Sequence, residues 1–226
     1  MVNISTPWKK SRTFGDIYGG RRRLRLNDNI FQRAHSLKKP SDNDELPILI
    51  QDNPSRDFLF PITAEDAKQA IQALPNNDAE GITHIWLRRL NKTEYEKGQL
   101  PLAEFICGSG VRLIILYPFP KSLKMDLGNK KPSARKLKEL QKFCDNISHS
   151  KDGWSIQWDI DSLKKYYVNN LLYHEIGHHV DWYSRHWSSA NNKKLEEFAD
   201  QYAIQKTALA TEVINKLQNQ CGEVTI

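Results

Sequence analysis

The stretch His174-Glu175-Ile176-Gly177-His178 lies within a run of helical periodicity from about Asp161 to Ser184. Residues four apart share one face of a helix, so both imidazoles can reach a single ion. Glu175 follows the first histidine and points beside that ion, where a carboxylate can accept a proton from a metal-bound water. The pattern predicts a metal site on this helix.

A second helix is expected from Lys194 to Ala203. Its first carboxylate, that of Glu196, lies eighteen residues after His178. Glu196 and Asp200 stand four apart there and share a face. Because a catalytic zinc usually takes three protein ligands and keeps a fourth position for water, Glu196 is the candidate third ligand. Asp200 is placed to accept a hydrogen bond from the other ring nitrogen of His174.

Small side chains occur where these two helices have to meet. Gly177 lies inside the histidine motif, and Ala199 and Ala203 lie on the face that carries the two carboxylates. Small residues allow helix backbones to approach closely. We therefore expect the two helices to pack tightly enough to share one ion.

The motif HEIGH followed by an E-x-x-x-D helix resembles the gluzincin group of zinc metallopeptidases. The segment E-E-F-A-D-Q-Y-A (196–203) is similar to that of small members with a minimal catalytic core. The resemblance covers only about residues 166–204. It implies zinc ligands His174, His178 and Glu196, general base Glu175, and Asp200 as the hydrogen-bond partner of a ligand.

Other ligand assignments remain open from the sequence. Glu197 replaces Glu196 if the second helix is rotated by one position, and Glu196 is preferred because it stands four residues before the aspartate. His186, in the connection between the helices, is a weaker alternative. The extended metzincin motif does not fit, because Asp181 and Ser184 occupy the positions that require glycine and histidine.

The expected chemistry is metal-assisted hydrolysis of an amide bond. Zinc lowers the pKa of bound water and polarises the carbonyl, while Glu175 takes the water proton and delivers it to the leaving amine. A further donor to the oxyanion is usually needed. Tyr202, Tyr183 and His186 are the candidates, and the sequence does not choose among them.

The expected fold is α+β and zincin-like, with a small mixed sheet packed on the histidine helix and the glutamate-bearing helix. Thr63 is expected to cap a helix that ends before Pro75, and another helix is expected near 133–146. Strands are predicted at 82–90, 102–107, 111–119 and 154–159. The resemblance implies an exposed sheet edge over the zinc, provided either by 154–159 or by the hairpin 102–118.

The chain of 226 residues is predicted to divide into two parts. Residues 1–59 form a basic N-terminal extension and linker, with a short edge strand near 46–50. Residues 60–226 form the zincin-like metallopeptidase domain. A hydrophobic content of 39%, including six Trp and eight Phe, is enough for a core.

The positive charge is concentrated at the N-terminus. Residues 1–40 contain ten Lys or Arg against two Asp, a net +8, whereas the remaining residues contain 23 basic and 25 acidic side chains. The basic residues 9–39 could bind nucleic acid or an acidic partner. A solvated tail, or packing on an acidic surface of the same chain, is the simpler interpretation.

The location expected from the sequence is cytoplasmic. The N-terminus shows no apolar signal core, no apolar run is long enough to span a membrane, and three scattered cysteines are typical of a reducing compartment.

The predicted function is a zinc metalloendopeptidase with one zinc per chain, acting with narrow specificity on an intracellular protein, although the same ligand set can hold other divalent metals. The alternative is a non-catalytic regulator that binds nucleic acid or protein and has a structural or degenerate zinc site.

Overall fold

The computed structural model describes residues 17–18, 21–22, 40–90, 102–108, 111–144, 146–184 and 191–222. These residues form a mixed α+β protein of small sheets and packed helices, which confirms the expected class. The finer zincin-like description stays a prediction. The division at residue 60 stays a prediction as well.

The central sheet has four strands in the order β3-β5-β7-β6. β3, β5 and β7 run parallel, and β6 is antiparallel to β7, so the sheet is mixed as expected. The strands are β3 (Ile48–Gln51), β5 (His84–Leu87), β6 (Ala103–Gly108) and β7 (Val111–Leu116). The edge strand expected near 46–50 is therefore β3.

Both faces of this sheet are buried. Ile114 and Leu116 of β7 belong to the large core shared with the helices, whereas Leu113 and Ile115 belong to a second cluster that also contains Trp86. Successive side chains of a strand point to opposite faces, and strands covered on both sides read as continuous apolar runs. This is why the run from Val111 to Leu116 contains only one polar residue.

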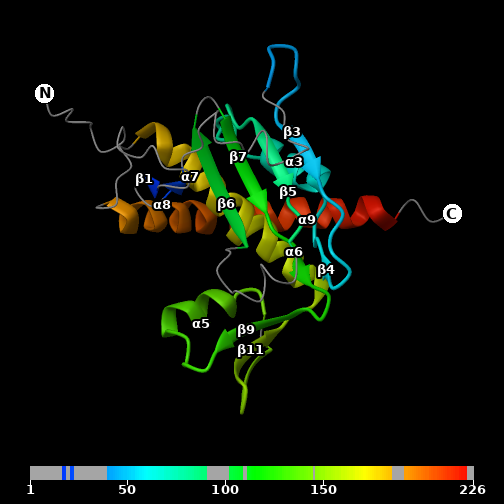
Figure 1. Ribbon diagram of the computed structural model, residues 1–226, viewed down its shortest axis with the longest axis vertical. Helices are drawn as coiled ribbons and strands as arrows, with labels where there is room; N and C mark the ends of the chain where they lie inside the picture. Colours follow the sequence, from blue (N-terminus) through cyan, green and yellow to red (C-terminus); the bar gives the residue numbers. More distant parts are fainter. Residues whose placement is uncertain are drawn as a thin grey trace, which may run out of the picture.

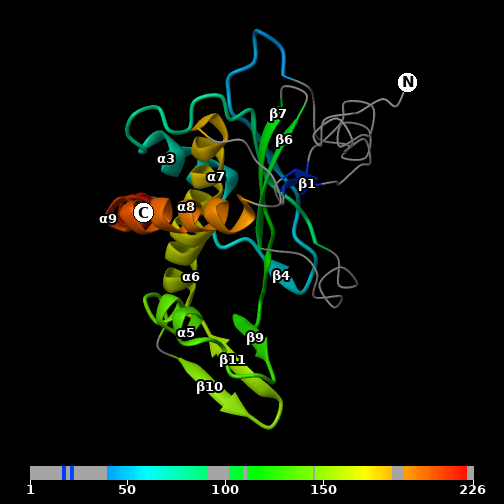
Figure 2. The same ribbon diagram turned by 90° about the vertical axis from the view of Figure 1, so that its left-hand side faces the viewer.

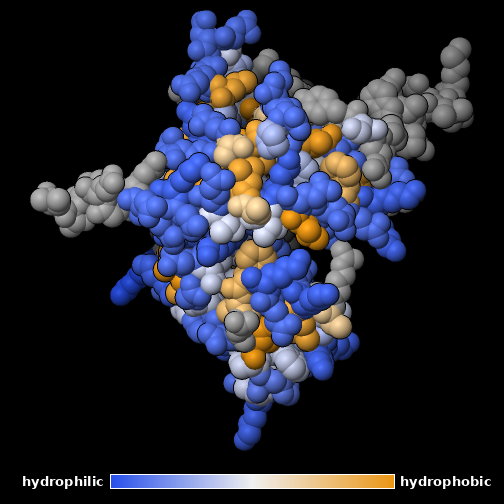
Figure 3. All heavy atoms as spheres, turned by 180° about the vertical axis from the view of Figure 1, so that it is seen from behind, coloured by the Kyte–Doolittle hydropathy of each residue, from blue (hydrophilic) through white to orange (hydrophobic). Residues whose placement is uncertain are grey.

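Helices cover one face of the sheet, as Figure 2 shows for α3, α7, α8 and α9. Their bounds are α3 (Ala64–Gln72), α6 (Ile160–Tyr166), α7 (Tyr173–Ser184), α8 (Asn192–Gln205) and α9 (Thr207–Gly222). The capping box expected at Thr63 is present, with the Asp66 N–H donating to the threonine hydroxyl at 3.0 Å. Figure 3 shows hydrophilic side chains over most of this helix-bearing side.

A lower lobe extends from the end of the molecule opposite β3 (Figure 1). It consists of β9 (Lys124–Gly128), α5 (Ala134–Leu140), β10 (Ile147–Ser150) and β11 (Gly153–Gln157). A two-strand ladder of β4 (Phe58–Leu59) and β8 (Phe119–Pro120) precedes the lobe. The lobe sheet has the order β10-β11-β9, so β11 is the central strand. The expectation that 154–159 provides a free sheet edge is therefore wrong, because β11 has a neighbour on both sides.

The helical run that carries the two histidines consists of three consecutive segments. Asp159 caps α6 by accepting the Ser162 N–H at 2.8 Å. The chain then continues through a π-helical segment, η1 (Tyr167–Leu172), before α7 starts. The helical run expected from about 161 to 184 is therefore present, and a π-helical segment divides it between α6 and α7. Short π-helical segments within helices are often found at functional sites.

Within the basic segment 9–39, the structure describes two short strands. β1 (Ile17–Tyr18) pairs with β2 (Arg21–Arg22), and β2 lies beside β6. The rest of the predicted basic partner-binding segment, residues 9–39, lies outside the described part of the chain. No helix in the described ranges is long and apolar enough to span a membrane.

Candidate metal centre

Two histidines of α7 turn their Nε2 atoms toward each other. The Nε2 atoms of His174 and His178 lie 3.0 Å apart, and the two rings meet edge to face with centroids 4.6 Å apart. Both residues lie on one helix face because they are one turn apart. His178 is fully buried, whereas His174 is partly open to a cleft.

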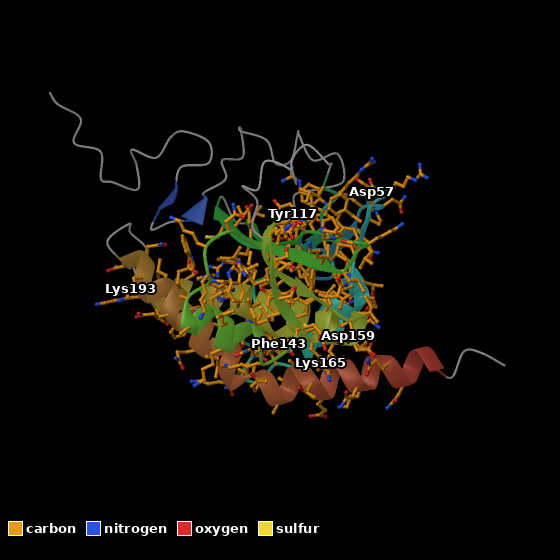
Figure 4. The ribbon with its side chains drawn as sticks, turned by 90° about the horizontal axis from the view of Figure 1, so that it is seen from below. Asp57, Tyr117, Phe143, Asp159, Lys165 and Lys193 are labelled. Carbon is orange, nitrogen blue, oxygen red and sulfur yellow. The ribbon has the colours of Figure 1, made fainter. Side chains whose placement is uncertain are left out.

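Glu196 of α8 brings a carboxylate to the same point. Its Oε2 atom lies 3.4 Å from Nε2 of His174 and 3.7 Å from Nε2 of His178. These three residues form a group that could hold a metal ion. Glu197 points elsewhere, with Oε1 lying 3.7 Å from Nζ of Lys193 near the start of α8 (Figure 4). The carboxylate that meets the histidines is thus the one four residues before Asp200.

Asp200 contacts the other nitrogen of the first histidine. Its Oδ1 atom lies 3.2 Å from Nδ1 of His174. A proton on Nδ1 directed at this carboxylate leaves Nε2 unprotonated and facing His178 and Glu196, which is the tautomer a metal requires. The expected partnership of Asp200 and His174 is therefore present in the geometry.

The electrostatics of the group favour an added positive charge. Burial lowers the pKa of His174, but hydrogen bonds to Asp200 and Glu196 and the nearby Glu175 charge outweigh burial and raise this pKa to about 9. At neutral pH, and with no other cation present, His174 is therefore in its positively charged imidazolium form. The same carboxylates would stabilise a metal ion in place of that proton.

Close contact between α7 and α8 places these side chains. A Cβ atom on Gly177 would lie 2.8 Å from the Cα of Ala199 and 3.1 Å from the Cβ of Tyr202. Such distances are too short for a real side chain, so glycine is required at this crossing. The tight approach expected from the small residues is confirmed at Gly177 and Ala199.

A cleft of about 1020 Å³ opens beside the group. Glu175 is 95% buried and lines this cleft together with His174 and Asp200. The start of β6, the helix α5, the segment η1 and the helix α8 supply the other walls. Glu175 therefore stands next to the candidate metal group and at the wall of a cavity large enough for a ligand.

β6 is an edge strand, and its first residues line the cleft. The Tyr117 N–H donates to the Leu102 carbonyl at 2.9 Å. In an antiparallel ladder, alternate residues bond to the partner strand. The backbone polar groups of Ala103, Phe105 and Cys107 therefore point away from β7, toward the outer edge. Of the two expected edges, only the hairpin edge meets the cleft.

Of the three candidate oxyanion donors, the structure describes the side chain of Tyr202 alone. The Tyr202 hydroxyl donates to Oδ2 of Asp78 at 2.6 Å, and Nζ of Lys206 lies 3.3 Å from the same oxygen. Burial and then the Asp78 carboxylate raise the pKa of Tyr202. The Tyr183 side chain and all of His186 lie outside the described residues.

Sequence reasoning missed the opposite wall of the cleft. Asn170 of η1 donates to Oε1 of Glu139 on α5 at 3.1 Å, and Nζ of Lys136 lies 3.5 Å from the same oxygen. Lys138 and Lys142 also line the cleft. The only signal was the density of basic residues between 133 and 146, and nothing in their spacing relates them to the histidine motif.

Comparisons with protein-family models, with curated proteins and with solved structures gave no match to this chain. The functional assignment therefore depends on the local geometry of the group and of its cleft.

Proposed function

We propose that the chain is a zinc-dependent peptidase whose metal is held by His174, His178 and Glu196. The convergence of three ligand atoms from two helices next to the buried carboxylate of Glu175 carries this proposal. A structural zinc site normally has four protein ligands, whereas three ligands beside a cleft are typical of a catalytic site.

The distances within the group fit zinc. Four ligands placed tetrahedrally at the usual Zn–N and Zn–O bond lengths lie about 3.4 Å from one another. The observed separations of 3.0, 3.4 and 3.7 Å fall on both sides of this value. Two imidazoles and one carboxylate are also a donor set that zinc accepts.

The residues of the chain have distinct roles in the proposed reaction. When bound, zinc would polarise the substrate carbonyl and make water more acidic. Glu175 accepts the proton of the attacking water and returns it to the leaving amine. Asp200 holds the His174 ring in its ligating tautomer, and the start of β6, at Leu102 and Ala103, pairs with an extended peptide.

The substrate that fits this arrangement is a protein or peptide segment in extended form. Because β6 provides a short edge and the cleft has a restricted size, we propose narrow specificity for a protein target. We propose that this target is an intracellular protein.

The test combines metal content with hydrolysis. Wild-type protein is expected to bind about one zinc per chain and to cleave members of a degenerate peptide pool, detected by mass spectrometry. Glu175→Gln should retain zinc and lose about 10²–10⁴-fold in kcat. Glu212→Gln, which removes a carboxylate paired with Lys216 on α9, is the matched control and should change neither value.

Two results would contradict the proposal. Full hydrolysis by Glu175→Gln would remove the general base from the mechanism. Zinc binding by the wild type with no hydrolysis of any peptide would favour the alternative, a regulator with a non-catalytic metal site.

A further inference from the structure

We propose that Lys138 and Lys142 form a subsite that binds a carboxylate of the substrate, so that the peptidase selects acidic peptide segments. This inference rests on the proposed function and specifies its substrate class. Both lysines line the same cleft as His174 and Glu175.

The two lysines belong to a basic part of the molecule. Residues 124–157, which span the lower lobe, contain eight Lys or Arg and four Asp or Glu. The lobe thus carries a net +4, although the chain after residue 40 is slightly acidic as a whole. The cleft is lined by α5 of this lobe and by His174, Glu175 and Asp200.

The neighbouring charges leave these two lysines available. The one carboxylate that α5 contributes to the cleft, Glu139, is held by Lys136 at 3.5 Å and by Asn170 at 3.1 Å. Neither Lys138 nor Lys142 forms an ion pair with any residue in the described ranges. Both are exposed, so an incoming carboxylate can reach them.

The metal end of the cleft is lined by carboxylates, so the protein side chains there do not attract an acidic residue of the substrate. Glu175, Glu196 and Asp200 place carboxylates at that end, beside the candidate metal site. Glu197 also lines the cleft, but it lies near Lys193. The lysines that line the cleft, Lys136, Lys138 and Lys142, are therefore all at the α5 wall.

A peptide that pairs with the start of β6 can span both ends of the cleft. Leu102 and Ala103 of the edge strand line the cavity together with α5 and α7. With its scissile bond at the metal group, an extended peptide would direct a residue on one side of that bond toward the lysines. Opposite charges placed there would attract, and the attraction would weaken with salt.

The test uses degenerate peptide libraries digested by the zinc-loaded full chain, with cleavage sites read by mass spectrometry. We expect Asp and Glu to be enriched over Asn and Gln at a fixed distance from the cleaved bond. The double variant Lys138→Glu/Lys142→Glu should lose about tenfold in kcat/KM on the acidic substrate and little on its Gln counterpart. Lys138→Gln/Lys142→Gln should show a smaller loss.

A matched charge control comes from the same lobe. Lys130→Glu/Lys151→Glu makes an equal charge change at two exposed positions that do not line the cleft, and it should preserve the acidic preference. Libraries with amidated and with free C-termini separate an internal acidic side chain from a terminal carboxylate, and either source agrees with the subsite.

The outcomes separate this inference from the function on which it depends. Cleavage without acidic enrichment, or enrichment that survives reversal of both lysines, overturns the subsite and leaves the peptidase intact. If the wild type cleaves nothing, a Glu-rich and a Gln-rich fluorescent peptide are compared by anisotropy on the Glu175→Gln protein. Selective binding that depends on the two lysines supports the subsite, and equal binding overturns it.

Discussion

The two walls of the cleft are built in opposite ways. The α7–α8 wall has a helix crossing closed by Gly177 against Ala199, with His178 fully buried behind the cleft. The α5 wall is a helix of seven residues beside a three-stranded sheet, and Lys138 on this helix and Lys142 just after it are exposed. Close backbone packing holds the side chains of the first wall, whereas the second wall carries its charge on exposed side chains.

This difference separates chemistry from recognition. Metal binding and proton transfer need fixed distances between atoms, and therefore need the close-packed wall. Attraction of a charged substrate acts over several ångströms and tolerates mobile side chains. Changes in the α7–α8 wall should consequently reduce metal binding and kcat, and changes in the α5 wall should act mainly on KM.

The largest effect is expected from loss of the third ligand in the close-packed wall. Glu196→Ala removes the carboxylate that lies 3.4 Å from His174, so zinc affinity should fall about 100-fold or more, with loss of hydrolysis. The measurement is zinc content after dialysis, followed by titration with a chromogenic chelator. Glu197→Ala, the neighbouring exposed carboxylate, is the control and should retain the metal; the reverse result would assign Glu197 as the ligand.

Sequence predicted the metal group because that group is local. The four-residue spacings of His174 with His178, and of Glu196 with Asp200, each lie within one helix, so helix geometry alone places each pair on one face. Thr63 was likewise recognisable as a cap because the capping box spans four residues. Gly177 was expected at the crossing because only small residues permit close helix contact.

The remaining features depend on contacts between distant segments. Asn170 meets Glu139 across 31 residues, and Tyr202 meets Asp78 across 124. No periodicity records such pairs. The π-helical segment before α7 also escaped notice, because its residues have ordinary helical character and the altered hydrogen bonding arises in the folded helix. The sequence offered Tyr202 as a donor to the oxyanion, since nothing in it indicates that the hydroxyl donates to Asp78 instead.

The helix crossing provides the second test of the comparison. Gly177→Ala would place a methyl group 2.8 Å from the Cα of Ala199, a backbone atom that cannot move aside. We expect a loss of about 1–3 kcal/mol in the free energy of unfolding, despite the better helix propensity of alanine, because the helices must separate. Zinc affinity should fall with it. Thermal denaturation and zinc titration measure the two effects.

Ser184→Ala, at an exposed position on the same helix, serves as the control for the crossing and should change stability by less than about 0.5 kcal/mol. If Gly177→Ala is as stable as the wild type and keeps its zinc affinity, the crossing is not what fixes the metal group.

A smaller effect is expected behind the close-packed wall, at Tyr202. Tyr202→Phe removes the hydrogen bond to Asp78 and should cost about 1–2 kcal/mol of stability, since Lys206 still contacts the same carboxylate. The kcat of the folded protein should not change, because the hydroxyl is engaged away from the metal group. Tyr167→Phe, which removes a buried bond to the Tyr117 carbonyl, is the matched control. A 100-fold loss of kcat at normal stability would instead identify Tyr202 as the oxyanion donor.

The smallest effect is expected where the two walls are joined. Asn170→Ala removes the bond from η1 to Glu139, but the ion pair of Glu139 with Lys136 remains, so stability should fall by about 0.5–1.5 kcal/mol. The α5 wall would then be held less firmly, raising KM for an acidic peptide a few-fold and leaving kcat and zinc content unchanged. Asn192→Ala, exposed at the start of α8, is the control for steady-state kinetics. A fall in kcat with KM unchanged would show that the α5 wall also positions the reacting groups, and the separation of chemistry from recognition would then fail.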